Sequence, residues 1–322
     1  MEKLLNLLSD GKFHSGEDIG QNLGISRAAV WKKIRTLRSL GLSLESVKGT
    51  GYRLPVGLKL LDQHKIQAQL NSDILPLLTL HTDIVAESTN DWVRQIAAEH
   101  PDKNLHVCTV EYQSQGRGRR GRQWINPFGS TIALSLYWKL NQGLSQLEGL
   151  SLAIGLSVLK SLQSSGVEPL QLKWPNDILC HRKKLCGILL EASGDPNGES
   201  EVIIGIGINV LLNEEQLTSL GQPATDITHA CGFPISRNQL IAHLLNHLIP
   251  TLKQYEQKGF QPFRQEWCRH DAFFGQQVTL NMTRCQLTGT EQGVNELGQI
   301  LLEIDNEIRA FSAGEVSLRP AE

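Results

Sequence analysis

The sequence of 322 residues predicts an α+β protein in three parts: a winged helix-turn-helix at 1–60, a central domain at 65–270 and a small β-barrel at 271–322. Short helical patterns followed by a glycine turn fill the first part. Strand and helix patterns alternate in the second part. The third part contains short apolar runs separated by Gly and Asn, which are typical of a small barrel.

Two helices joined by a short turn are predicted near the N-terminus. Ser15 is an N-cap candidate because carboxylates follow it in the first turn, and Gly24 ends this helix. Ser26 caps a second helix that runs from residue 27 to about residue 40. Residues 48–51 form a glycine-containing turn between two short apolar runs, which predicts a β-hairpin wing.

The second helix has an apolar face and a basic face. At 3.6-residue spacing the apolar face collects Val30, Ile34 and Leu37. Residues 1–60 carry ten Lys/Arg against five Asp/Glu, a charge of +5, which leaves −7 for the rest of a chain whose net charge is −2. A basic module on an acidic body favours DNA over a docked protein as its partner. The residues predicted to contact DNA are Arg27, Ala28, Lys32 and Arg35.

Nothing in the sequence predicts export or a membrane partner. Residues 1–8 lack the long apolar core of a signal peptide, and no segment approaches the roughly 20 apolar residues of a membrane span. We therefore expect a cytoplasmic protein. Its six cysteines form no C-x-x-C pair, so we expect free thiols and no protein-held metal site.

Element boundaries in the rest of the chain follow the apolar patterns. Pro-Val-Gly at 55–57 predicts a linker, and 147–162 predicts a helix with a buried face. The expected central strands are 108–112, 131–137 and 202–210. The expected barrel strands are 277–280, 300–304 and 315–318.

The segment 116–122 is the most informative stretch of the central domain. Its glycines match G-x-G-x-x-G, but no regular helix follows and residues 135–147 contain no acid to bind a ribose, so the dinucleotide-binding interpretation fails. Four arginines among three glycines instead predict a flexible cationic loop that folds around an anion. A solvated surface loop and a second nucleic-acid contact are the alternatives.

Two further segments carry candidate site residues. Apolar runs around a polar turn at 182–183 predict a hairpin, and Lys184 would begin its second strand and point into a cleft. Gly205 and Gly207 lie in an apolar strand that ends at Asn209. Glycines in a strand indicate close approach by a ligand or another backbone, and Asn can bind an adenine edge. A tightly packed core strand is the alternative.

Five motifs follow one another along the chain: Ser-Thr-Asn at 88–90, Gly-Arg-Gly-Arg-Arg-Gly at 116–121, Lys-Trp-Pro-Asn-Asp at 173–177, Lys-Leu-Cys-Gly at 184–187 and Gly-Ile-Gly-Ile-Asn at 205–209. As an ordered set they closely resemble the biotin-protein ligase family. The N-terminal module and the segment 313–319 resemble its bacterial subgroup, which also represses the biotin operon. This resemblance implies a central domain related to class II aminoacyl-tRNA synthetases and an SH3-like barrel behind it.

The resemblance also implies residue roles. Lys184 and Arg119 would be catalytic, with Lys184 between the biotin carboxylate and the α-phosphate. The biotin-binding residues would be Ser88, Thr89, Asn90, Gln113, Arg117, Gly118, Arg119 and Lys184. The adenylate would be held by Gly116, Arg122, Asn176, Asp177 and Asn209, of which Asn176, Asp177 and Asn209 are assigned to nucleotide or metal contacts.

The chemistry of these residues agrees with that expectation. Attack of the biotin carboxylate on the α-phosphorus of ATP brings two anions together, so fixed cations and Mg²⁺ must offset their repulsion. The mixed anhydride needs a lid against water, which the loop 116–121 can supply. The expected partners are a biotin carboxyl carrier protein with an acceptor lysine, operator DNA, and a second copy of the chain in a ligand-induced homodimer formed near 189–193.

One departure from the resembling family and two rival functions stand beside this interpretation. Residues 211–224 contain no aromatic residue to cover the adenine, so that role is left unassigned. A transcription factor that senses a ligand without turnover is the first rival, but it gives Lys184 no chemical task. A lipoate or octanoate ligase is the second rival, and the arginine-dense loop argues against it.

Overall fold

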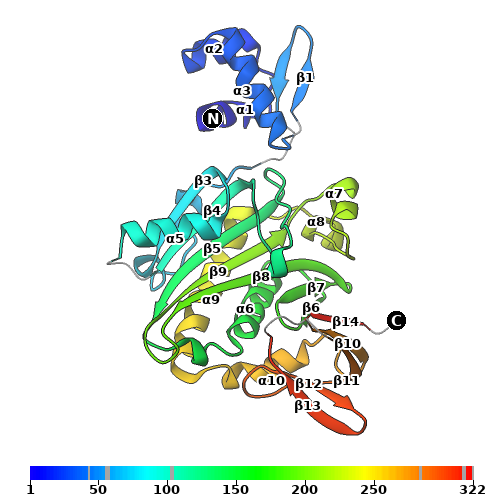
Figure 1. Cartoon of the computed structure of the whole chain (residues 1–322). Helices are drawn as coiled ribbons and strands as arrows, with labels where there is room; N and C mark the ends of the chain where they lie inside the picture. The colour runs from blue at the N-terminus through cyan, green and yellow to red at the C-terminus, as the bar shows by residue number, and fades with distance from the viewer. Residues whose placement is uncertain (43, 55–58, 102–104, 283–284, 314–316, 321–322) are drawn as a thin grey trace.

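A computed structural model describes residues 1–42, 44–54, 59–101, 105–282, 285–313 and 317–320. The N-terminal module, the central domain and the C-terminal sheet follow one another along the molecule (Figure 1). The linker predicted at 55–57 lies outside the described residues. None of the helices in these ranges has the length and apolar character needed to cross a bilayer.

The N-terminal module is a winged helix-turn-helix. Its elements are α1 (Glu2–Leu8), α2 (Gly16–Leu23), α3 (Arg27–Ser39), β1 (Glu45–Val47) and β2 (Gly51–Arg53). Ser15 caps α2 in a reciprocal capping box with Asp18, and Gly24 ends it in the left-handed region at φ 66°. Ser26 accepts a hydrogen bond from the Ala29 N–H and caps α3. The predicted helix signals and the β-hairpin wing are therefore confirmed.

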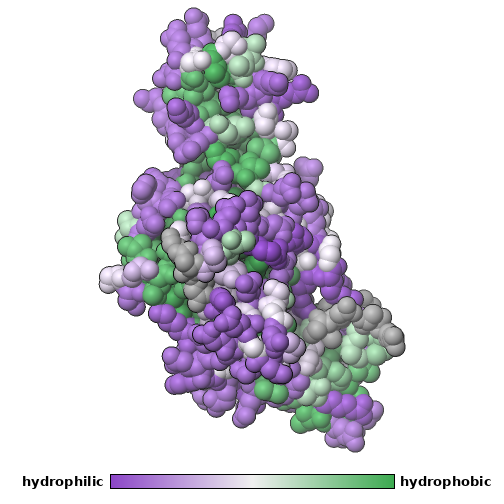
Figure 2. All heavy atoms as spheres, turned by 60° about the vertical axis from the view of Figure 1, so that its left-hand side comes forward, coloured by the Kyte–Doolittle hydropathy of each residue, from purple (hydrophilic) through white to green (hydrophobic). Residues whose placement is uncertain are grey.

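The core of the N-terminal module continues into the central domain. Val30, Ile34 and Leu37 of α3 are buried, as their spacing predicts. The same apolar cluster includes Phe128, which is 3% exposed, and Tyr112 packs against it from the central domain. Figure 2 shows apolar side chains at this junction. The two domains therefore share apolar contacts.

A buried ion pair fixes the first residues after the linker. Arg237 and Glu111 lie 2.7 Å apart with side chains 5% and 3% exposed. Arg237 donates to the Lys59 carbonyl, and Glu111 accepts from the Leu61 N–H. Because each charge has a charged partner and hydrogen bonds, both can remain buried.

The central domain is built on a seven-stranded sheet in the order β3-β4-β5-β9-β8-β7-β6. The strands are β3 (Thr79–Ala86), β4 (Leu105–Gln113), β5 (Thr131–Leu140), β6 (Leu170–Lys173), β7 (Asp177–Cys180), β8 (Lys183–Gly194) and β9 (Ser200–Asn209). Only β3 and β4 run parallel; every other neighbouring pair is antiparallel. The strands predicted at 108–112, 131–137 and 202–210 are confirmed, with small differences at their ends.

Helices cover both faces of this sheet (Figure 1). On one face α6 (Leu150–Ser164) and α9 (Arg237–Lys258) form the main core with the strands. On the other face α5 (Thr89–Glu99) packs on β4, β5 and β9, beside a smaller apolar cluster. The remaining helices are α4 (Gln63–Gln67), α7 (Glu214–Ser219), α8 (Ile227–Cys231), α10 (Gln261–Arg269) and the short 3-10 helices η1 (Leu75–Leu77), η2 (Arg119–Gly121) and η3 (Leu144–Gln146).

The C-terminal domain is a five-stranded antiparallel sheet in the order β13-β12-β11-β10-β14. Its strands are β10 (Gln277–Asn281), β11 (Gln286–Val294), β12 (Ile300–Ile304), β13 (Glu307–Phe311) and β14 (Ser317–Pro320). The predicted strands at 277–280 and 300–304 are confirmed, while part of the prediction at 315–318 lies outside the described residues. The sequence analysis did not predict β11, whose residues are mostly polar, or β13, which is short and mostly exposed.

Candidate functional site

A cavity of about 660 Å³ opens on the α5 side of the central sheet. Its walls come from the start of α5, the loop 117–125, the turn 173–177 and the segment 219–224. The C-terminal domain contributes Leu318 and Arg319. Segments far apart in the sequence therefore enclose one site, and the central and C-terminal domains supply its walls.

Glycines make the floor of the cavity. Strand pairing places Gly187 of β8 opposite Gly207 of β9. A Cβ atom on Gly207 would overlap the Trp124 ring, and one on Gly205 would lie 2.6 Å from Asn90 Oδ1. Both positions require glycine because another side chain approaches the strand closely. The residues that approach, Asn90 and Trp124, themselves line the cavity.

The start of α5 supplies a buried polar network. Gln113 Oε1 accepts hydrogen bonds from the Thr89 N–H at 2.7 Å and the Thr89 hydroxyl at 3.0 Å. The Ser135 hydroxyl lies 2.7 Å from Thr89 Oγ1 and 2.5 Å from Asn90 Oδ1. Ser88 is the N-cap residue, and its side chain makes no capping hydrogen bond. This network fixes the side chains at one end of the cavity.

Two buried donors in the cavity wall have no hydrogen-bond partner among the described residues. They are the side-chain nitrogens Asn90 Nδ2 and Trp124 Nε1. A buried donor without a partner is unfavourable, and a bound ligand with acceptor oxygens would satisfy it. Both nitrogens are buried, so an acceptor oxygen would reach them only after a movement of the wall.

Arg117 fixes the loop 116–122 to the start of α5 and to β8. Its guanidinium contacts Asp91 at 2.5 and 2.8 Å and Glu191 at 3.1 Å. The hydrogen bond from Arg117 holds the pKa of Asp91 below its usual value. Arg94 contacts the same two carboxylates. Arg117 therefore has acidic partners before any anion arrives, and it also lines the cavity wall.

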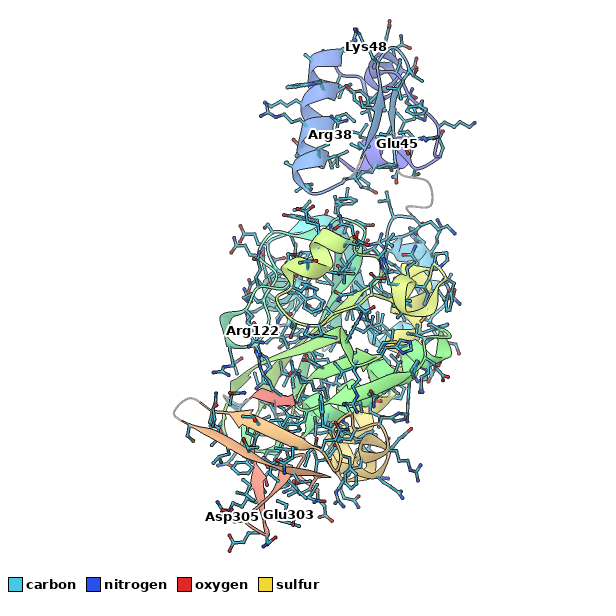
Figure 3. All side chains as sticks on the ribbon, turned by 90° about the vertical axis from the view of Figure 1, so that its right-hand side faces the viewer. Arg38, Glu45, Lys48, Arg122, Glu303 and Asp305 are labelled. Atoms are coloured by element: carbon cyan, nitrogen blue, oxygen red, sulfur yellow. The ribbon has the colours of Figure 1, made fainter. Side chains whose placement is uncertain are left out.

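Arg119 connects the loop to two other parts of the chain. It donates to Asn176 Oδ1 at 3.2 Å and to the Ala313 carbonyl at 2.6 Å. Burial lowers the pKa of its guanidinium. The next residue, Arg120, adopts the left-handed conformation at φ 58°, which turns the chain sharply there. Arg122, beyond this turn, lies exposed at the side of the molecule (Figure 3).

Lys184 lies at the opposite wall, near the start of β8. Its Nζ is 2.7 Å from Asp177 Oδ1 and 5.8 Å from the centroid of the Trp124 ring. The side chains of Lys184 and Asp177 are only 18% and 14% exposed. His181 and Arg182, both with positive φ, form the preceding turn, one residue before the predicted position. The prediction that a hairpin presents Lys184 to a cleft is confirmed.

The segment 219–224 closes the cavity beside Lys184. The Lys184 N–H donates to the Pro223 carbonyl, and the Thr225 N–H donates to the Lys184 carbonyl, both at 2.9 Å. Asn209 Nδ2 donates to the Thr225 carbonyl at 3.0 Å and is buried. The Asn209 amide therefore positions this segment. No aromatic residue occurs in it, as the sequence indicates.

The cavity is strongly cationic. Asp177 is the one acidic residue among its described lining residues. Burial lowers the pKa of Lys173, whose surroundings include Asp177 and Lys184. Such a wall favours a ligand with several negative charges. The basic lining residues are Arg117, Arg119, Arg120, Arg122, Lys173, Arg182, Lys184 and Arg319.

The structure brings nearly all the predicted site residues to this one cavity. Gly116 is the exception: it lies behind the wall, where a Cβ would be 2.5 Å from the Trp124 carbonyl oxygen. The sequence reasoning missed Trp124, Lys173 as a wall residue, and the segment 219–224. A Trp directly after a polar glycine loop was the available signal for Trp124. The predicted residues that line the cavity are Ser88, Thr89, Asn90, Gln113, Arg117, Gly118, Arg119, Arg122, Asn176, Asp177, Lys184 and Asn209.

A second candidate surface is the outer face of α3. The four predicted DNA-contacting residues, Arg27, Ala28, Lys32 and Arg35, are all exposed there. Arg38 lies near the end of this helix and Lys48 in the turn of the wing (Figure 3). A basic helix beside a β-hairpin wing has the geometry of a recognition helix for the major groove.

Family models match all three parts of the chain. A model of the biotin/lipoate A/B protein ligase family matches residues 84–209, an HTH domain model matches 1–53, and a biotin protein ligase C terminal domain model matches 273–319. The central fold and its cationic cavity thus define a protein ligase of the biotin/lipoate class.

Similar proteins cover the whole chain. The bifunctional ligase/repressor BirA of Salmonella typhimurium is 39% identical over 99% of this chain and 97% of its own length. BirA of Escherichia coli is 38% identical with the same coverage. The chain belongs to this family of bifunctional ligase/repressors. The solved biotin protein ligase from Aquifex aeolicus in complex with biotin and ATP aligns with a TM-score of 0.62 at 29% identity, over 76% of this chain and 99% of that one.

Proposed function

We propose that this protein joins biotin to AMP at the expense of ATP, transfers the biotinyl group to a lysine of a biotin carboxyl carrier protein, and represses biotin synthesis genes through α3. The observation that carries the proposal is the cationic cavity with a glycine floor and a single described carboxylate. It belongs to a chain that matches bifunctional ligase/repressors over almost its full length.

Charge explains the first half-reaction. The biotin carboxylate attacks the α-phosphorus of ATP, a P–O bond forms, and the bond to the diphosphate leaving group breaks. Lys184 from one wall and Arg119 from the other would stabilise the negative charge that develops between these two anions. The low exposure of Lys184 strengthens this interaction, because less water screens it.

Hydrogen-bonding groups support a proposed placement of the two ends of the ligand. The network of Thr89, Gln113 and Ser135, with the free Asn90 amide donor, offers the polar contacts that a ureido ring requires. The adenylate would then lie toward Arg122, Asn176 and Lys173, beside the segment 219–224. Trp124 lies over Gly207 between these ends and would cover the acyl chain.

Mg²⁺ fits this site as a companion of the phosphates. Among the described residues no group of three or more His, Cys, Asp or Glu could hold a metal ion. Mg²⁺ commonly binds through one or two carboxylates together with substrate phosphates. Asp177, with Asn176 beside it, would hold the ion, which neutralises phosphate charge when bound.

Transfer requires a neutral acceptor lysine. Its amine attacks the acyl carbon of the mixed anhydride, an amide bond forms, and AMP leaves with the bonding electron pair. Asp177, the carboxylate in the cavity wall, would receive the released proton.

Repression requires two copies of α3 at the spacing of two operator half-sites. The outer half of β8 supports the proposed ligand-induced homodimer. β8 pairs with β9 as far as Gly194, whereas β7 pairs with β8 only as far as Gly187. Within the described ranges no strand covers the edge at 189–194, so it is open to pair with a second copy.

The proposed division into domains at 1–60, 65–270 and 271–322 follows these roles: DNA contact, ligation and closure of the site. The described elements suit it, because β2 ends at Arg53, α4 begins at Gln63 and β10 begins at Gln277. The cytoplasmic location stays a prediction.

A panel of carboxylic acids tests the function. Release of diphosphate from ATP is measured with biotin, lipoate, octanoate or no acid. We expect release with biotin alone, followed by biotinylation of a carrier protein. Release of diphosphate with lipoate or octanoate would indicate the rival ligase. If none of the acids causes release, only a ligand sensor would remain.

A further inference from the structure

Trp31 is a large aromatic residue on the outer face of α3. Its side chain is 56% exposed, whereas Val30 and Ile34 on the inner face are 1% exposed. The Arg35 guanidinium lies 5.7 Å from the centroid of the Trp31 ring. Trp31 is not part of the apolar cluster that holds the N-terminal module together. The apolar core of the module therefore does not include this ring, and the ring is accessible to a partner that contacts the outer face of α3.

The surroundings of Trp31 select the partner. Residues at i and i+4 are neighbours on a helix surface, so Arg27, Trp31 and Arg35 form one ridge. Helix α3 contains five Lys/Arg and no acid. An exposed ring beside a guanidinium, on a helix without acidic residues, suits a polyanion with flat polar edges rather than an apolar protein groove.

We propose that Trp31 contacts the C5 methyl group of a thymine in the major groove, near a guanine bound by Arg35. This inference rests on the proposed DNA-binding function of α3. The thymine methyl is the apolar group that a base pair presents in the major groove, and guanine O6 and N7 match a guanidinium. Four helical residues rise about 6 Å, so the two contacts lie about two base pairs apart at roughly 3.4 Å per pair.

The test uses the full-length protein with biotin and ATP. Wild-type protein selects duplexes from a random-sequence library, and the recovered half-site is then resynthesised with deoxyuridine in place of one thymidine at a time. Affinities are measured at fixed salt for wild type, Trp31→Ala and Trp31→Phe, with Thr36→Ala as an exposed control on the same helix.

We expect one thymine in each half-site at which deoxyuridine weakens wild-type binding about fivefold. Trp31→Ala should bind about fivefold more weakly and lose sensitivity to deoxyuridine at that position, while Trp31→Phe and Thr36→Ala keep it. Three results would overturn the inference: no sensitive thymine, unchanged sensitivity in Trp31→Ala, or a loss confined to dimerisation. If wild type enriches no duplex, the proposed DNA-binding function itself fails, which is a distinct outcome.

Discussion

Lys184 and Asp177 form an ion pair of 2.7 Å across the β7–β8 hairpin, in the wall of a cavity that is otherwise lined by cations. The pair holds the Lys184 ammonium in place before an anionic ligand arrives. A fixed charge of this kind stabilises a transition state without the cost of reorganisation at the moment of reaction.

Replacement of Lys184 should therefore slow catalysis. We expect Lys184→Ala to slow diphosphate release with biotin and ATP by about 100-fold, because one fixed positive charge at the reacting centre is lost. The matched control is Lys183→Ala, since Lys183 is exposed at the adjacent position. Equal losses in the two variants would mean that Lys184 has no special role.

Arg119→Gly should release the adenylate. The arginine bonds to both Asn176 and the Ala313 carbonyl, so its loss frees the loop from two anchors. We expect the half-life of bound biotinyl-adenylate, measured by filter retention, to fall at least about tenfold, with biotinylation of bystander proteins. Arg120→Gly is the control, because φ 58° suits glycine there. A lid role is excluded if Arg119→Gly retains adenylate like wild type.

Gly207→Ala should weaken biotin binding. The added methyl group would overlap the Trp124 ring and displace it from the cavity floor. Overpacking of this kind costs about 1–3 kcal/mol, which corresponds to roughly fivefold or more in affinity by calorimetric titration. Gly155→Ala in α6 is the control, because its Cβ would meet other atoms only at 3.6 Å or more. Unchanged affinity in Gly207→Ala would show that Trp124 does not contact the ligand.

The contact between the central domain and the C-terminal sheet should weaken as pH rises. Asp271 follows α10, Glu291 lies on β11, and burial raises the pKa of both carboxyl groups. A carboxyl whose pKa is raised in the folded state stabilises the fold most below its ordinary pKa. That contribution is lost as pH rises toward the folded value.

Thermal unfolding between pH 5 and pH 9 tests this prediction. We expect the midpoint to fall by about 4 °C or more in wild type and much less in Glu291→Gln. Glu307→Gln is the control, because the Glu307 side chain is 72% exposed in the same sheet. Cys268 also faces Glu291, so Cys268→Ala should be compared. If the unfolding midpoint of Glu291→Gln falls with pH as much as that of wild type, the pH dependence comes from other groups.

Changes on α3 should affect DNA binding and leave ligation intact. Lys32→Ala should weaken binding to any duplex and reduce the slope of log affinity against log salt by about 1, because one phosphate contact is lost. Arg35→Ala should also weaken operator binding. Both residues are exposed and far from the cavity walls. An equal loss of ligation would point to misfolding instead.

Local signals made the N-terminal module predictable. Ser15 and Ser26 cap their helices through hydrogen bonds within three residues, so the sequence alone specifies them. The class II synthetase relation and the SH3-like description came only from resemblance to a family. The strand β13 was not predicted because it is short and mostly exposed, and only pairing with β12 makes it a strand.

The cavity wall was predictable only in part. Arg119 and Lys184 lie in motifs with a distinctive order, whereas the segment 219–224 enters the site through its pairing with Lys184, about 40 residues earlier. Trp124 lines the site because Gly207, on strand β9, leaves room for the Trp124 ring. Such long-range contacts depend on the packed sheet and leave no local pattern.

Mass spectrometry of the intact protein after incubation with biotin, ATP and Mg²⁺ tests the central claim most directly. The account predicts a non-covalent complex with the mass of one biotinyl-adenylate, lost on addition of a biotin carboxyl carrier protein and absent in Lys184→Ala. A folded wild-type sample that binds biotin and ATP but forms no acyl-adenylate would contradict it.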